Sequence, residues 1–245
     1  MACRDVLTHD AHAPGDTVAS FFDDFGDFSL GGQAVDSSLP PTEPVPLAPA
    51  PWQFEMGDTA SRRIDTHDPT QPLRFDGMVL RPWTRNDARS MAEAVRESVA
   101  TVGRWMDWCH PGFGVRDAID WADACADSLA QGKACEFGLF DERSGRLVGG
   151  AGLNQFNTSH RVCNLSYWVR QSAQGQGIAT RAARSLASYG FSVLGFQRIE
   201  IVVAEGNEPS LAVALKLGAQ FECLARNRLM IRGKPVSAWV QSLLP

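Results

Sequence analysis

The sequence has no run of apolar residues long enough to cross a bilayer, and its N-terminus lacks the apolar core of a signal peptide. Its six cysteines are scattered: none forms a Cys-x-x-Cys pair, and none lies at metal-binding spacing from a histidine. These absences argue against a transmembrane helix and a zinc site, and they favour reduced thiols over disulfides. We therefore expect a cytoplasmic protein with no bound metal and no membrane partner.

Acidic residues and prolines are concentrated at one end of the 245-residue chain. Residues 1–70 contain 12 acidic residues, 3 basic residues and 8 of the 14 prolines, and they show neither helical nor strand periodicity. This composition predicts a disordered, acidic, proline-rich extension over residues 1–70 and a folded domain over residues 71–245. Aromatic and acidic residues alternate at 18–28, which fits either a disordered tail or a docking motif that folds on a partner.

The predicted domain carries a mild net positive charge, with 20 basic and 16 acidic residues after residue 70. A surface of this sign suits an anionic ligand and tolerates a ribosomal neighbourhood. It falls well short of the charge that nucleic-acid-binding domains carry. We therefore expect no direct nucleic-acid partner.

The order of predicted elements indicates the fold class. Strands are predicted at residues 78–82, 136–140, 147–154, 162–169, 198–203 and 221–224, with a final pair around residues 232–234. Helices are predicted from an Asp87 cap to residue 95, over residues 117–131, from residue 179 to about 194, and from Asn207 or Ser210 to Gly218. One strand, two helices, three strands and then alternating elements predict a mixed α/β sheet rather than a doubly wound one.

The stretch from Tyr167 to Thr180 carries the clearest functional signal. It is predicted to form a strand end, a polar loop containing Gly175 and Gly177, and the first turn of a helix. The first N–H groups of a helix have no partner within it and lie at the positive end of its dipole. Such a loop is either an ordinary turn or an anion site suited to a phosphate or pyrophosphate.

The loop lacks the Gly-Lys-Ser/Thr of a Walker motif and the third glycine of a dinucleotide-binding motif. Its pattern Gln174-x-x-Gly177-x-Ala179 instead resembles the coenzyme A pyrophosphate loop of the GNAT N-acetyltransferases. The segments 198–200, 207–210 and 217–218 resemble the same superfamily. Together they look most like the branch of ribosomal-protein N-terminal acetyltransferases of RimJ/RimL type, over about residues 73 to 244.

The resemblance implies a mixed, mostly antiparallel α/β (α+β type) central sheet with helices on both faces, and acetyl-CoA as the cosubstrate. It also implies a set of cofactor-binding residues on the strand end, the loop, the helix start and the downstream Asn: Trp168, Val169, Gln174, Gly175, Gln176, Gly177, Ile178, Ala179, Thr180 and Asn207. A helix cap is the alternative role for Asn207, and both roles are compatible.

Two residues are candidates for proton transfer. The resemblance implies that Ser210 protonates the leaving thiolate, although a serine at a helix start also serves there structurally. No carboxylate occupies the positions where relatives carry the base. Glu200 lies on the same strand face as one of these positions, Val202, so it is a candidate base, but an ion pair with an Arg is its alternative role.

The acceptor is the least constrained part of the hypothesis. An N-terminal α-amine, with a pKa of about 7.7, needs less help from a base than a lysine of about 10.4, so a missing base favours a protein N-terminus. Small amines such as aminoglycosides or polyamines are the alternative acceptors, and a non-catalytic acyl-CoA-binding module is the alternative class. Trp105 and Trp108 either line the acceptor pocket or pack in the core. A homodimer is compatible with the sequence.

Overall fold

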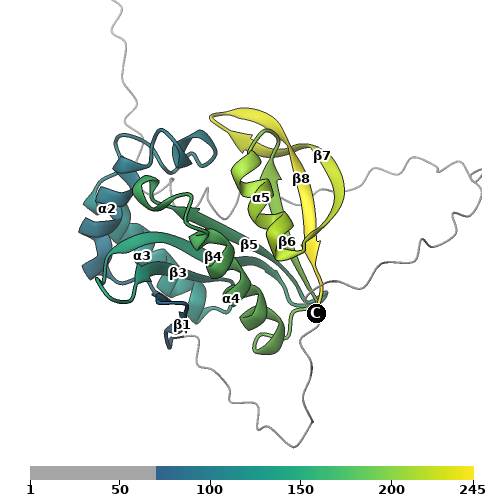
Figure 1. The fold of residues 1–245 in the computed structure, drawn as a ribbon, viewed down its shortest axis with the longest axis horizontal. Helices are drawn as coiled ribbons and strands as arrows, with labels where there is room; N and C mark the ends of the chain where they lie inside the picture. Colours follow the sequence, from purple (N-terminus) through teal and green to yellow (C-terminus); the bar gives the residue numbers. More distant parts are fainter. Residues whose placement is uncertain (1–69) are drawn as a thin grey trace, which may run out of the picture. The chain divides into compact units, whose positions relative to one another are not determined.

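An eight-stranded sheet forms the centre of the structure, a computed structural model that describes residues 70–245 (Figure 1). The predicted extension over residues 1–70, with the segment at 18–28, lies outside the described residues except for Thr70. The strands are β1 (Leu73–Phe75), β2 (Met78–Pro82), β3 (Cys135–Asp141), β4 (Leu147–Asn157), β5 (Val162–Val169), β6 (Arg198–Ala204), β7 (Gln220–Ile231) and β8 (Lys234–Leu243).

The strand order is β1-β2-β3-β4-β5-β6-β8-β7. Every neighbouring pair is antiparallel except β5 and β6, which run parallel. Helix α4 connects these two strands, as a parallel crossover requires. The mixed, mostly antiparallel sheet confirms the predicted fold class.

Helices cover both faces of the sheet (Figure 1). Helices α4 (Ile178–Ser192) and α5 (Glu208–Leu217) pack on one face, where the core contains Leu153, Leu186 and Ile199. Helices α2 (Ala88–Glu97) and α3 (Val115–Ala130) pack on the other face. Short 3₁₀ turns are η1 (Arg85–Asp87), η2 (Val102–Arg104) and η3 (Gln171–Ala173). No helix among residues 70–245 is both long and apolar enough to span a bilayer.

The predicted elements differ from the structure in detail. The Asp87 carboxylate does not cap α2, because it accepts hydrogen bonds from the Arg81 guanidinium at 2.6 and 2.8 Å and from the Thr84 N–H at 2.9 Å. Strand β7 runs to Ile231 rather than ending at Leu224, and two register shifts against β8 hide its alternation in the sequence.

Candidate active site

The parallel strands β5 and β6 separate soon after they pair. Their register contains only Val162↔Arg198, Cys163↔Ile199 and Asn164↔Glu200. Beyond the last pair, β5 continues to Val169 and β6 continues to Ala204, without further pairing between them. We call the point after Asn164 and Glu200 the β5–β6 fork. Both strands have unpaired edges beyond it, so an extended ligand could find backbone partners there.

The glycine loop follows the end of β5 and leads into α4. Gly175 and Gly177 adopt φ angles of +77° and +70°, a region that favours glycine, and Gly177 is the N-cap of α4. A Cβ atom at Gly175 would meet nothing within 4 Å, so the loop has open space beside it. The helix dipole and the first N–H groups of α4 point into this region, which is the geometry of an anion site.

Gln174 fixes the loop to its surroundings. Its Nε2 atom donates to the Val169 carbonyl at 2.8 Å and to the Thr101 hydroxyl at 3.2 Å. Val169 ends β5 and Thr101 precedes η2, so one side chain connects the loop to both segments. Of the predicted cofactor-binding residues, Gln174 thus has its side chain engaged with the protein itself.

Arg181, in the first turn of α4, was not predicted as a site residue. Its Nη1 donates to the Gln176 carbonyl at 3.0 Å, so the guanidinium lies against the glycine loop. Its Nε is buried and has no hydrogen-bond partner among the described residues. An unpaired buried donor beside an open, glycine-lined helix start fits a phosphate group. A basic residue four positions after Gly177 was the sequence signal that could have identified it.

Two hydroxyl groups meet on the α4/α5 face. The Tyr167 hydroxyl lies 3.1 Å from both the carbonyl oxygen and the Oγ of Ser210, which joins β5 to the start of α5. The Asn207 side chain caps α5 by accepting from the Ser210 N–H at 3.4 Å. Burial raises the pKa of Tyr167 to about 12, so its hydroxyl stays protonated at neutral pH. Because Asn207 is the cap of α5, Ser210 is not. The sequence did not predict Tyr167 as the hydrogen-bond partner of Ser210.

Glu200 lies on the opposite face of the sheet from this hydroxyl pair. It accepts a hydrogen bond from Arg198 at 2.9 Å, and Arg198 also binds Glu222 at 2.5 and 2.7 Å. The Arg198 guanidinium and the Ser242 hydroxyl lower the pKa of Glu222 to about 2. Glu200 is therefore held in the arginine ion pair that the sequence offered as its alternative role.

The two candidate acceptor-pocket tryptophans lie in different surroundings. The Trp108 ring packs edge-on against Trp168 of β5, with centroids 5.4 Å apart. Trp105 lies beside Gly206, in the loop before Asn207, where a Cβ atom would be 3.8 Å from the indole. Both are only partly buried, and both border segments that hold predicted cofactor residues.

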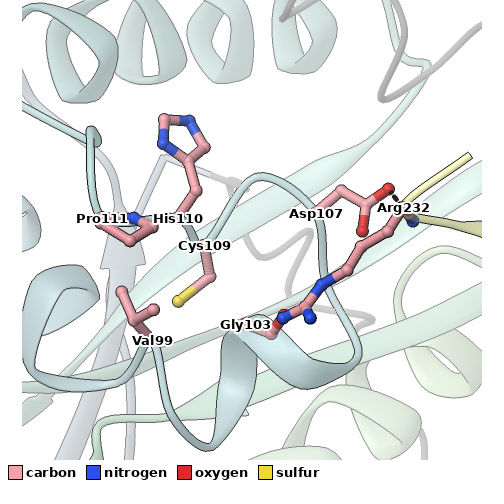
Figure 2. Close-up of a pocket in the computed structure, with 7 residues that line it drawn as sticks. All are labelled: Val99, Gly103, Asp107, Cys109, His110, Pro111 and Arg232. Carbon is pink, nitrogen blue, oxygen red and sulfur yellow. Dashed lines mark hydrogen bonds between the residues drawn. The ribbon is translucent and has the colours of Figure 1, made fainter.

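A pocket of about 380 Å³ is lined mainly by sequence neighbours of these tryptophans, although neither tryptophan lines it (Figure 2). The turn between β7 and β8 closes one side of it. There, the Arg232 N–H donates to the Asp107 carboxylate at 2.7 Å, and the Arg232 guanidinium donates to the Gly103 carbonyl at 2.7 Å. The lining residues are Val99, Gly103, Asp107, Cys109, His110, Pro111 and Arg232.

Comparisons with known proteins define the class. Residues 78–220 match the acetyltransferase (GNAT) domain family, so the chain belongs to the GNAT acetyltransferases, and it is an acetyl-CoA-dependent N-acetyltransferase by family. YdaF of Bacillus subtilis, provisionally named a ribosomal N-acetyltransferase, is 31% identical over 161 residues, or 64% of this chain and 85% of that protein.

Two further relatives differ in the acceptor that their names give. The spermidine N(1)-acetyltransferase of Escherichia coli K12 is 31% identical over 155 residues, or 63% of this chain and 79% of that protein. A Vibrio cholerae structure, provisionally described as a ribosomal-protein-serine acetyltransferase, is 32% identical with a TM-score of 0.66. It covers 72% of this chain and 99% of its own. The predicted GNAT family is therefore confirmed, and the relatives include enzymes named for ribosomal proteins, as the resemblance implied.

Proposed function

We propose that this protein transfers an acetyl group from acetyl-CoA to the N-terminal α-amine of a protein. One observation carries the proposal: beyond the β5–β6 fork, β5 carries Tyr167, whose hydroxyl meets that of Ser210, and then leads into the glycine loop at the start of α4. A loop for a pyrophosphate, open strand edges for an extended arm and a protonated hydroxyl pair together suit acyl transfer from a thioester.

The cofactor-binding residues act mainly through their backbone in this proposal. The N–H groups of residues 175–180 bind the pyrophosphate, with the Arg181 guanidinium beside them. Backbone groups of Trp168 and Val169 bind the pantetheine arm along the open edge of β5. The Asn207 side chain, which caps α5, keeps an amide Nδ2 that can bind the same arm.

The chemistry requires a proton at the thiolate and the loss of a proton from the amine. When bound, acetyl-CoA supplies the acetyl thioester. Ser210 donates its hydroxyl proton toward the departing sulfur, and the adjacent Tyr167 hydroxyl stabilises the serine oxygen. The acceptor approaches from the α2/α3 face, past Trp105 and Trp108, where its free amine can reach the thioester carbonyl at the fork.

A polyamine is the second candidate acceptor, because a spermidine acetyltransferase is among the relatives at 31% identity. The two acceptors differ in proton affinity: an α-amine has a pKa of about 7.7 and a primary alkyl amine one of about 10.4. At neutral pH the α-amine is therefore the easier nucleophile.

An acceptor screen tests the proposal. Peptides with free N-termini, the same peptides with acetylated N-termini, spermidine and an aminoglycoside are incubated with acetyl-CoA, and release of free thiol is followed. We expect turnover with free N-termini and none with the blocked peptides. Turnover only with spermidine would assign the second candidate. Tight acetyl-CoA binding without turnover on any amine would point to a non-catalytic binding module.

A further inference from the structure

A buried carboxylate with a set of hydrogen-bonded amides lies across three strands on the α2/α3 face. Glu136 of β3 is 9% exposed, and its Oε1 accepts from the Asn154 Nδ2 at 2.7 Å. The same Nδ2 donates to the Ser166 hydroxyl at 3.0 Å, and the Asn154 Oδ1 accepts from the Asn164 Nδ2 at 2.9 Å. We call these four residues, Glu136, Asn154, Asn164 and Ser166, the polar band.

The hydrogen bonds of the polar band fix which atoms remain available. Asn154 uses both amide hydrogens as donors and its oxygen as an acceptor, so the Asn164 oxygen points away from it. The Ser166 oxygen accepts one hydrogen bond from Asn154 and keeps a second lone pair that can accept another. Among the described residues, no donor contacts the Glu136 Oε2. Within residues 70–245, the Asn164 amide oxygen and the Glu136 Oε2 therefore have no hydrogen-bond donor, and the Ser166 oxygen can accept one more hydrogen bond.

The chain makes room for the Glu136 carboxyl with a glycine. Gly152 lies between Glu136 and Ser166 in the strand register, and a Cβ atom at Gly152 would be 2.0 Å from the Glu136 Oε2. The carboxyl thus lies over β4, where any side chain at residue 152 would exclude it. The Glu136 side chain thus extends from β3 toward β5. These two strands are two spacings apart, or roughly 10 Å.

The polar band opens at the β5–β6 fork. Glu136 and Asn154 are buried, whereas Asn164 and Ser166 on β5 are half-buried. Asn164 is the last residue of β5 that pairs with β6, and Ser166 lies just beyond the fork. The exposed end of the polar band is therefore where the proposed function requires the acceptor amine to arrive.

Building on the proposed function, we infer that the polar band is the acceptor-amine site and that Glu136 accepts the proton of the incoming ammonium. A primary ammonium carries three N–H donors, which match the free oxygens of Glu136, Asn164 and Ser166 in number and type. The resulting free amine attacks the thioester carbonyl carbon. A C–N bond forms, the C–S bond breaks, and the thiolate receives the second amine proton through the Ser210 hydroxyl.

The environment of Glu136 suits this role. Burial raises its pKa to about 7, and the hydrogen bond from Asn154 opposes the rise. The nearby titratable groups are the buried thiols of Cys125 on α3 and Cys135 on β3, whose pKa values are raised by burial and by the Glu136 charge. No ion pair to Glu136 occurs within residues 70–245. A base is most effective when its pKa lies near the working pH.

The variant Glu136→Gln tests the inference, because glutamine keeps the shape and can still accept from Asn154 but cannot take up a proton. With an α-amine peptide acceptor, we expect kcat/KM to fall roughly tenfold to a hundredfold at pH 7. The deficit should shrink at pH values above about 8, where the free α-amine predominates. With spermidine it should persist to higher pH. Calorimetric affinity for acetyl-CoA should equal that of the wild type.

Two further variants serve as a control and as an alternative test. Glu142→Gln changes an exposed carboxylate at the β3–β4 turn and should leave the pH profile unchanged. If Glu136→Gln does not fold, Ser166→Ala, which removes only the hydroxyl of a half-buried residue, should raise the acceptor KM several-fold without changing acetyl-CoA affinity. A Glu136→Gln deficit that is equal at every pH, or no deficit, would overturn the inference.

Failure of the proposed function would look different. If the wild type acetylates no amine, the proposed function is wrong. The acceptor-site inference is then tested by binding alone: ¹³C NMR should show the Glu136 carboxyl titrating near neutral pH, with an added primary amine lowering that pKa. An unchanged titration in the presence of the amine would reject the site independently of turnover.

Discussion

The two faces of the sheet differ in chemistry at the β5–β6 fork. On the α4/α5 face, the Tyr167 and Ser210 hydroxyls and the helix start with Arg181 present hydrogen-bond donors. On the α2/α3 face, the carboxylates of Glu136 and Glu200 present acceptors. Donors stabilise a pyrophosphate and a departing thiolate, and acceptors bind an ammonium. This difference fits our proposal that donors on the α4/α5 face bind the cosubstrate and acceptors on the α2/α3 face bind the amine.

One strand supplies both faces. Successive side chains of a β-strand point in opposite directions, so Tyr167 contacts Ser210 of α5 while its neighbour Ser166 binds Asn154 on the other face. Trp168, next along β5, packs against Trp108 on the Ser166 face. Because β6 leaves β5 after Asn164, a ligand in the gap could contact both sets of side chains. The division of roles thus follows from alternation and the fork together.

The largest effect is expected from Gly177→Asp, which tests the donor face. The variant places a carboxylate at the N-cap of α4 and a side chain on a backbone with φ of +70°. Repulsion of a pyrophosphate should weaken acetyl-CoA binding roughly a hundredfold, as measured by calorimetry. Gly177→Asn is the matched control, because it has the same shape without the charge and tolerates this backbone. Equal affinity in wild type and Gly177→Asp would remove the pyrophosphate from this loop.

Ser210→Ala should have the next largest effect, on rate rather than on binding. Loss of a general acid typically costs about 10²–10⁴ in rate, and a thiolate is a fairly good leaving group, so we expect a fall in kcat at or below the low end. Acetyl-CoA affinity should be unchanged. Asn207→Ala is the contrasting variant, since it removes the cap of α5 and should lower stability by ~1 kcal/mol. Normal kcat in Ser210→Ala would leave the serine a structural partner of Tyr167.

Sequence reasoning reached the donor face better than the acceptor face, for a physical reason. The glycine loop, the Asn207 cap and the Gly218 helix end are local features, and residues within a few positions determine them. The polar band joins residues 10 to 18 positions apart through the register of three strands. It also depends on the absence of a side chain at Gly152, and nothing in the local sequence shows that a carboxyl occupies that space.

The Tyr167–Ser210 contact was missed for the same reason. The two residues are 43 positions apart, and α4 and β6 lie between them. Tyr167 was interpreted only as a strand former, although its position two residues after Leu165 predicts the same face as the core. The acidic charge of residues 1–70, by contrast, follows from composition alone, because it does not depend on any tertiary contact.

The smallest effect is expected from Glu200→Gln, which separates the two carboxylates of the acceptor face. Glu200 is the carboxylate that the sequence indicates as a candidate base, and it is the register partner of Asn164 of the polar band. Its ion pair with Arg198 is partly exposed, with side chains 28% and 24% accessible, so its loss should cost at most ~1 kcal/mol of stability. Arg198 keeps Glu222 as a partner and stays in place. We therefore expect kcat/KM to fall less than about threefold and equally at every pH, since a positioning effect does not follow the ionisation of the amine. Parallel pH profiles of Glu200→Gln and Glu136→Gln with one α-amine peptide make the comparison direct. A deficit that grows at low pH in Glu200→Gln, with a flat ratio in Glu136→Gln, would exchange the two roles and make Glu200 the proton acceptor.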